Sequence, residues 1–211
     1  MAVTDVTETD VPTTGATDET LALTAGDAPV EAPAPRGISN VATALFVAGE
    51  FMVLCGLVAA YYAVRTQAFK WPAVGLGTYL PSMVALTMVM TAVTVQWAIW
   101  AIRHNDQRTT LAALGITIFF AFAVLNGQWY GLAHLRFDVA ASTYGTFVYV
   151  LTGFHMANVI AGIVVLAAVL VRAVSGEFSA DDHDTLTAAA VFWQFTNVAG
   201  LVAYAVLFLH P

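Results

Sequence analysis

The sequence predicts an all-α membrane protein, a bundle of five transmembrane helices preceded by a disordered acidic tail. Two observations support this prediction. Of the 211 residues, 59% are hydrophobic and only 10% are charged, whereas soluble domains average about 25% charged residues. Apolar stretches of about 20 residues or more recur five times along the chain, and each can cross roughly 30 Å of hydrocarbon. Because backbone groups in lipid must pair within their own segment, each stretch is expected to be a helix.

The acidic tail comprises residues 1–37, and the transmembrane domain comprises residues 38–211. The formal net charge is -7, yet seven of the fourteen acidic residues precede Arg36. The tail is rich in Thr, Ala, Asp and Pro and lacks aromatic residues. It cannot bury enough apolar surface to fold, so we expect it to be disordered. Its first residues, MAVTDVTETD, do not resemble a cleaved signal peptide, so the first helix is expected to direct insertion.

The five expected helices are separated by short polar segments. Arg65, Lys70 and the pair Trp71-Pro72 follow the first helix, and Pro81 falls in the first turn of the second, where its missing N–H is harmless. Polar segments at 103–108, 136–138 and 172–184 separate the remaining helices. The expected helices run from Ser39 to Val64, from Tyr79 to Ile102, from Leu111 to His134, from Tyr144 to Val171 and from Leu186 to Leu209.

The basic residues of the short loops indicate the orientation of the bundle. With the amino terminus in the cytoplasm, four basic residues lie inside and three outside. An odd number of helices then places the carboxyl terminus outside. The inside set is Arg36, Arg103, Arg108 and Arg172, and the outside set is Arg65, Lys70 and Arg136.

The helices contain few groups that could carry chemistry. Glu50 and His155 are the ionisable side chains deep inside them. Lys70, the only lysine, lies in a loop, which excludes a retinal Schiff base. His155 has no comparably deep histidine partner for a haem, and no metal site, phosphate loop or nucleophile with a base is recognisable. We therefore expect no redox centre, catalytic residue or metal on this chain, and no nucleic-acid partner.

Glu50 lies near the middle of LFVAGEFMVLCGLVAAYY, where an ionised carboxylate is disfavoured by several kcal/mol. The neutral acid is therefore the expected form. A structural interpretation has it donate a hydrogen bond to a helix carbonyl or to an amide such as that of Gln128. A functional interpretation has it exchange protons with a neighbouring protein. The sequence leaves both open.

The remaining buried polar side chains suggest contacts between helices. Asn158 follows His155 at i+3 and shares its face, and Gln194 and Asn197 have the same spacing in the last helix. Gln128 adds an amide near the end of the third helix. Because an amide facing lipid is left unpaired, we expect these five residues to form a helix-packing polar cluster.

Several motifs together resemble those of one known family. Tyr144-Gly145-Thr146-Phe147 followed by Thr152-Gly153-Phe154-His155 resembles that family's Y-G-S-x-F and A-T-G-F-H-G-x-H. Glu50 falls where the family has a buried glutamate, and Trp71-Pro72 matches its W-P-P loop. The family that these motifs resemble is subunit III of the haem-copper oxidases, in its short five-helix bacterial form. The resemblance covers about residues 38–211, all of the chain except the tail.

This resemblance implies an accessory subunit of cytochrome c oxidase in a bacterial or archaeal plasma membrane. Such a subunit packs beside catalytic subunit I and subunit II, which hold the haems and copper. It binds phospholipid and supports proton uptake and the lifetime of the active site during aerobic electron transport. The electron donor, a cytochrome c or a quinol, is left open.

The chain departs from the family pattern at four ionisable positions. Asn158 replaces the second histidine of the G-F-H motif, Gln194 and Asn197 replace the basic and acidic residues of W-H-F-x-D, and Gly131 replaces a glutamate. This neutralisation keeps an alternative open, a subunit-III-like accessory protein of a nitric oxide reductase. An independent channel or transporter is a further alternative, although broken helices and repeated halves are not visible.

Overall fold

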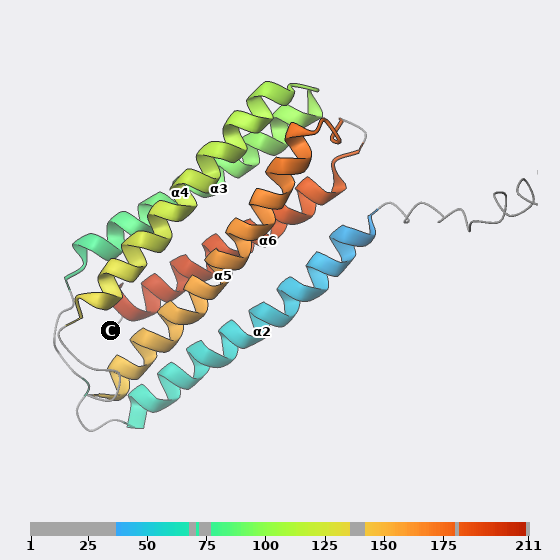
Figure 1. Ribbon diagram of the computed structural model, residues 1–211. Coiled ribbons are helices and arrows are strands. Elements are labelled where there is room, and N and C mark those ends of the chain that lie inside the picture. The colour runs from blue at the N-terminus through green and yellow to red at the C-terminus, as the bar shows by residue number, and fades with distance from the viewer. Residues whose placement is uncertain (1–36, 68–70, 72–76, 136–141, 180–181, 210–211) are drawn as a thin grey trace, which may run out of the picture. The chain divides into compact units, whose positions relative to one another are not determined.

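The computed structural model describes residues 37–67, 71, 77–135, 142–179 and 182–209, and all regular structure in these residues is helical (Figure 1). Five helices are long and apolar enough to cross a membrane, which confirms the predicted multi-pass, all-α architecture. They are α2 (Ile38–Gln67), α3 (Tyr79–Arg103), α4 (Gln107–Ala133), α5 (Thr143–Val174) and α6 (Asp184–Tyr204), the last of which continues as the π-helix η1 (Ala205–Leu209).

Some predictions fall outside the described residues. The acidic tail, residues 1–37, lies outside them except for Gly37, which precedes α2. Three of the basic residues used for the orientation, Arg36, Lys70 and Arg136, are also outside, as is Pro72.

The helices are longer than the apolar stretches because polar residues prolong or cap them. α4 begins at Gln107 instead of Leu111, since Asp106 accepts a hydrogen bond from the backbone N–H of Thr109 at 3.1 Å and so caps the helix. Hydrogen bonds from the Thr109 hydroxyl and backbone N–H hold the pKa of Asp106 below its ordinary value of 3.8. Asn105, at φ 54°, makes the tight reversal between α3 and α4, a conformation that asparagine tolerates better than most residues.

Helix α6 lies at the centre of the packing. It contacts α2, α3 and α5, and α4 contacts α3 and α5. α2 lies along the outside of this group (Figure 1). In its most apolar 18-residue stretch only 6% of residues are buried, against 50% in α6. Most of α2 is therefore left uncovered by the other described helices.

Two apolar clusters hold the helices together. The larger joins α3, α4, α5 and α6 around Trp193, whose side chain is 1% exposed. The smaller lies at the carboxyl-terminal end of α6 and is rich in aromatic rings. In it the ring of Tyr61 lies 5.4 Å from that of Trp71 and 5.6 Å from that of Phe147, both edge to face, an arrangement that aromatic pairs prefer.

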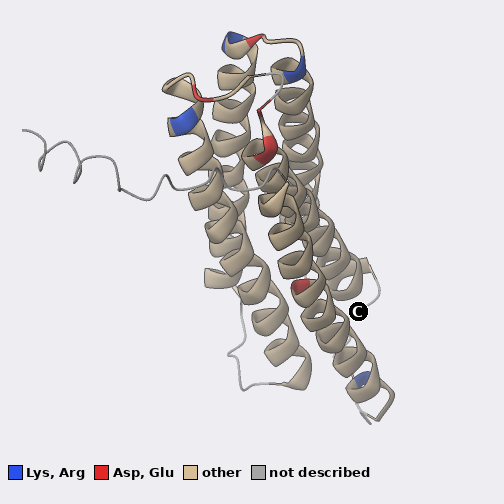
Figure 2. Ribbon diagram, turned by 90° about the vertical axis from the view of Figure 1, so that its right-hand side faces the viewer, with Lys and Arg blue, Asp and Glu red and all other residues tan. Residues whose placement is uncertain are grey.

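Charged residues of the described chain gather at the ends of the helices and leave the middle of the bundle almost without charge (Figure 2). At one end Arg172 pairs with Glu177 at 2.7 Å and stacks over Phe178. This distribution is that of a protein whose ends meet water and whose middle meets hydrocarbon. The acidic residue in the interior of α2 is Glu50.

Candidate functional site: a polar layer within the bundle

Glu50 of α2 is partly buried and faces α5. Its Oε2 accepts a hydrogen bond from Nδ2 of Asn158 at 3.1 Å, and Asn158 is only 6% exposed. An amide partner for the acid is thus present. That partner is Asn158, whereas Gln128, the amide named from the sequence, binds elsewhere.

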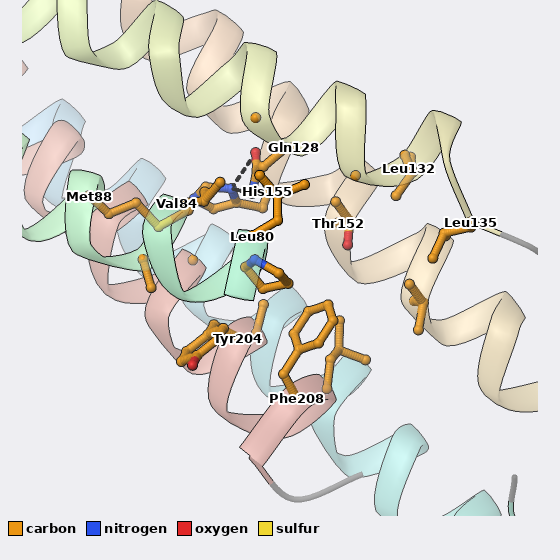
Figure 3. A pocket seen from close by; sticks show the side chains of 18 of the residues that line it. Leu80, Val84, Met88, Gln128, Leu132, Leu135, Thr152, His155, Tyr204 and Phe208 are labelled. Carbon is orange, nitrogen blue, oxygen red and sulfur yellow. Dashed lines mark hydrogen bonds between the residues drawn. The ribbon is translucent and has the colours of Figure 1, made fainter. Parts of the chain in front are cut away.

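His155 of α5 is held by two other helices and is 2% exposed. Its Nε2 lies 3.1 Å from the carbonyl oxygen of Thr196 in α6, and its Nδ1 lies 2.8 Å from Nε2 of Gln128 in α4 (Figure 3). A carbonyl only accepts, so Nε2 of His155 carries the proton. In a neutral ring Nδ1 then accepts from the Gln128 amide, and both ring nitrogens are satisfied.

Gly200 of α6 makes this contact possible. A Cβ atom at Gly200 would collide with Nε2 of His155 and would lie 2.7 Å from the sulfur of Met88. The absence of a side chain therefore lets the imidazole approach the α6 backbone and reach the Thr196 carbonyl.

The two amides of α6 bind α3 and are separate from His155. Gln194 donates to the carbonyl oxygen of Ala92 at 2.9 Å, and Oδ1 of Asn197 accepts from the hydroxyl of Thr91 at 2.9 Å. Among the described residues, Nδ2 of Asn197 is buried without a partner. The predicted cluster is therefore divided: Gln194 and Asn197 bind α3, His155 binds Gln128, and Asn158 binds Glu50.

Sequence reasoning missed the threonine and tyrosine contacts. The hydroxyl of Thr117 in α4 donates to that of Thr94 in α3 at 2.8 Å, and the hydroxyl of Tyr144 donates to the carbonyl oxygen of Leu207 in η1 at 2.7 Å. The signal available was the spacing of Thr91 and Thr94, two hydroxyls at i and i+3 inside an apolar helix.

His134 is exposed at the end of α4. Its ring stacks on that of Tyr130 at 3.9 Å, and its Nδ1 lies 2.9 Å from the Tyr130 carbonyl oxygen. It takes no part in the buried polar contacts. Trp129 and Tyr130 are likewise exposed, at 64% and 53%, as residues of an interfacial aromatic belt are.

A cavity of about 520 Å³ lies beside the His155–Gln128 pair, bounded by α3, α4, α5 and α6 with η1 (Figure 3). Its lining is mostly aliphatic, and the pair forms part of its wall. Glu50 and Asn158 do not line it.

The polar layer consists of separate pairs. Asn158 binds Glu50, His155 binds Gln128 and Thr196, and Asn197 binds Thr91. Among the described residues, no hydrogen bond links the Glu50 pair to the His155 group. The arrangement ties helices together.

The pattern of the family described as Cytochrome c oxidase subunit III matches residues 31–210. Cytochrome c oxidase subunit 3 of Synechocystis sp. is 30% identical over 169 residues, which cover 78% of this chain and 72% of that protein. The proteins of the same name from Oncorhynchus clarkii and Thermostichus vulcanus are 33% and 26% identical, and the matches cover 66% and 84% of their lengths.

Proposed function

Since the chain belongs to the cytochrome c oxidase subunit III family, we propose that it serves as a non-catalytic subunit of a respiratory haem-copper oxidase in a bacterial or archaeal plasma membrane. It packs against catalytic subunit I and subunit II, which hold the haems and copper. Its amino terminus lies in the cytoplasm and its carboxyl terminus outside.

The observation that supports an accessory role is the setting of Glu50. The acid is partly buried and has one hydrogen-bond partner, Asn158, on a helix that is otherwise largely uncovered. It is therefore within reach of a neighbouring subunit or of protons delivered along its surface. We propose that it supports proton uptake by the oxidase and the lifetime of the active site.

The outer surface of α2 is the proposed site for phospholipid. Phe51 and Met52 are 56% and 75% exposed, and apolar side chains of this size in a membrane protein contact acyl chains or another subunit. Lipid on this surface would also exclude water from the approach to Glu50.

Replacing Glu50 by Gln tests the proton-related role. Gln keeps the size of the side chain and an oxygen that accepts from Asn158, so the complex is expected to assemble normally. We expect fewer protons pumped per electron or faster inactivation during turnover, measured on the purified complex in vesicles.

The control is Glu177→Gln, which neutralises an acid at the bundle end whose side chain is 50% exposed. It should leave pumping and lifetime unchanged. If Glu50→Gln pumps protons normally and has a normal lifetime, the Glu50–Asn158 contact serves only to pack the helices.

Purification in mild detergent identifies the partner. A haem-bearing partner that reduces oxygen is the expected result, and one that reduces nitric oxide would favour the nitric oxide reductase alternative. Ion or solute flux through the isolated chain in vesicles would instead indicate a channel or transporter.

A further inference from the structure

The cavity between α3, α4, α5 and α6 has the size and lining of a ligand site. Its volume of about 520 Å³ lies within the range of roughly 300–1,000 Å³ typical of small-molecule pockets, which are mostly apolar with a few polar groups. It extends from the His155–Gln128 pair toward Leu135 and Phe208 at the ends of α4 and η1 (Figure 3).

Most polar groups of the lining are already satisfied. Both ring nitrogens of His155 are engaged, the hydroxyl of Tyr204 is bound to that of Ser82 at 2.7 Å, and Nδ1 of His134 is bound to the Tyr130 carbonyl. These three residues therefore contribute shape more than hydrogen-bonding capacity.

Thr152 and Gln128 keep unused capacity. A threonine inside a helix commonly donates to the carbonyl one turn back, as Thr196 does to Phe192. Among the described residues, the Thr152 hydroxyl has no hydrogen-bond partner, and it lies in the cavity wall three residues before His155 (Figure 3). The carbonyl oxygen of Gln128 lies 3.1 Å from Nδ1 of His155. Because the proton of His155 is on Nε2, Nδ1 donates nothing to this oxygen, which therefore keeps its capacity as an acceptor.

The wall formed by α6 is unusual where it meets this cavity. The helix changes from α to π geometry at Ala205, and π segments are rare and often found at functional sites. Tyr144 binds the carbonyl of Leu207, one of the last carbonyls of the helix, which have no partner within it. Leu207 and Phe208 of this segment line the cavity.

We propose that this cavity binds a lipid-soluble molecule that carries a hydroxyl group, such as a long-chain alcohol or a quinol. The hydroxyl enters first, accepts a hydrogen bond from Thr152 and donates one to the carbonyl oxygen of Gln128. The hydrocarbon part fills the aliphatic end near Leu135 and Phe208. A bare acyl chain would leave both polar groups unpaired, which is unfavourable in an apolar site.

Photolabelling of the oxidase complex in lipid nanodiscs tests this site. The probe is 3-azioctanol, an eight-carbon alcohol whose diazirine inserts into adjacent residues on illumination, and mass spectrometry of peptides locates the label. We expect saturable labelling of cavity residues such as Met88 and Tyr204 that 1-octanol suppresses and octane does not.

Two variants and a control sharpen the test. Thr152→Val keeps the shape of the side chain, and loss of one hydrogen bond should raise the half-saturating probe concentration about fivefold. Gly131→Leu should abolish labelling, because a Cβ at Gly131 points toward Leu80 of the lining at 3.6 Å. Val164→Leu alters a 64% exposed position outside the cavity and should change nothing.

Competition by decylubiquinol distinguishes the two sources of the hydroxyl. If decylubiquinol suppresses labelling at a lower concentration than 1-octanol does, the site prefers a quinol ring. If decylubiquinol suppresses labelling less effectively than 1-octanol, the site prefers an aliphatic alcohol. The proposal is overturned by labelling that does not saturate, by labelling unaffected in both variants, or by octane competing as well as 1-octanol. If the complex that carries Gly131→Leu fails to assemble, the Thr152→Val variant and the competition experiments still test the proposal.

Discussion

His155 shows how a single buried polar side chain is satisfied by neighbouring helices. Its ring meets an α4 amide and an α6 backbone carbonyl at 2.8 and 3.1 Å, and Gly200 supplies the space. A polar group left unpaired in this setting costs about 1–3 kcal/mol. At the residue scale, the local fold therefore depends on the pairing of His155 with Gln128.

A double-mutant cycle measures that pairing. We expect His155→Leu and Gln128→Leu each to lower the free energy of unfolding by about 1–2 kcal/mol, because each leaves the partner unpaired. The loss of unfolding free energy in the double variant should be smaller than the sum of the two single losses by about 1 kcal/mol. The measurement is denaturant unfolding of the chain in detergent micelles.

The matched control combines His155→Leu with Gln194→Leu. Gln194 binds the Ala92 carbonyl in α3 and shares no partner with His155, so the two effects should add. If His155 and Gln194 were coupled as strongly as His155 and Gln128, the His155 and Gln194 contacts would not be independent of each other.

At the scale of helices, close approach of α5 and α6 depends on Gly162. A Cβ atom there would lie 2.6 Å from Cε3 and Cζ3 of Trp193, the 1% exposed side chain at the centre of the larger apolar cluster. The two helices pack at this distance because one of them presents no side chain, the usual role of small residues between membrane helices.

Gly162→Ala should therefore destabilise the helix pair. We expect a loss of about 1–3 kcal/mol, typical of an overpacked core, seen as a lower melting temperature of the purified complex. Gly153→Ala in the same helix is the control, since a Cβ there has no neighbour within 4 Å. It should be neutral or slightly stabilising, because Ala favours helix over Gly. Equal losses in both variants would contradict the packing argument.

At the scale of the whole described bundle, α2 contacts the other helices at its start, in its middle and toward its other end. At its start, Asp184 of α6 accepts hydrogen bonds from the backbone N–H of Gly37 at 2.8 Å and from the amide of Asn40 at 3.4 Å. Toward its other end, Tyr61 is fully buried among aromatic rings. The middle is joined to α5 through Glu50 and Asn158, so most of its surface remains available to lipid and partner subunits.

Asp184→Ala should loosen the start of α2. The first N–H groups of a helix have no partner within it. Removing the carboxylate that accepts from the Gly37 N–H should therefore destabilise the start of α2 by about 1 kcal/mol. We expect hydrogen exchange of the amides at residues 38–42 to become roughly fivefold faster.

Asp182→Ala, at a nearby exposed acid, controls for the loss of charge at this end of the bundle. It should leave the exchange of the same amides unchanged. If the amides at residues 38–42 exchange equally slowly in Asp184→Ala and in the wild type, α2 is held by its apolar contacts alone.

The number and type of the helices could be predicted because the causes are local. An apolar run of sufficient length must be helical in lipid, whatever its neighbours do. The starts of helices were less predictable, as Asp106 shows: its side chain caps α4 and draws Gln107 and the following polar residues into the helix.

The sequence by itself determined that the protein is a five-helix membrane bundle, and it placed Glu50 and His155 deep within the apolar stretches. Only the tertiary structure decided which groups meet: Asn158 with Glu50, and Gln128 with His155. Helical periodicity sets the face on which a side chain lies. The depth and rotation of one helix against another, which choose its partner, depend on packing among Gly162, Gly200 and the large side chains opposite them.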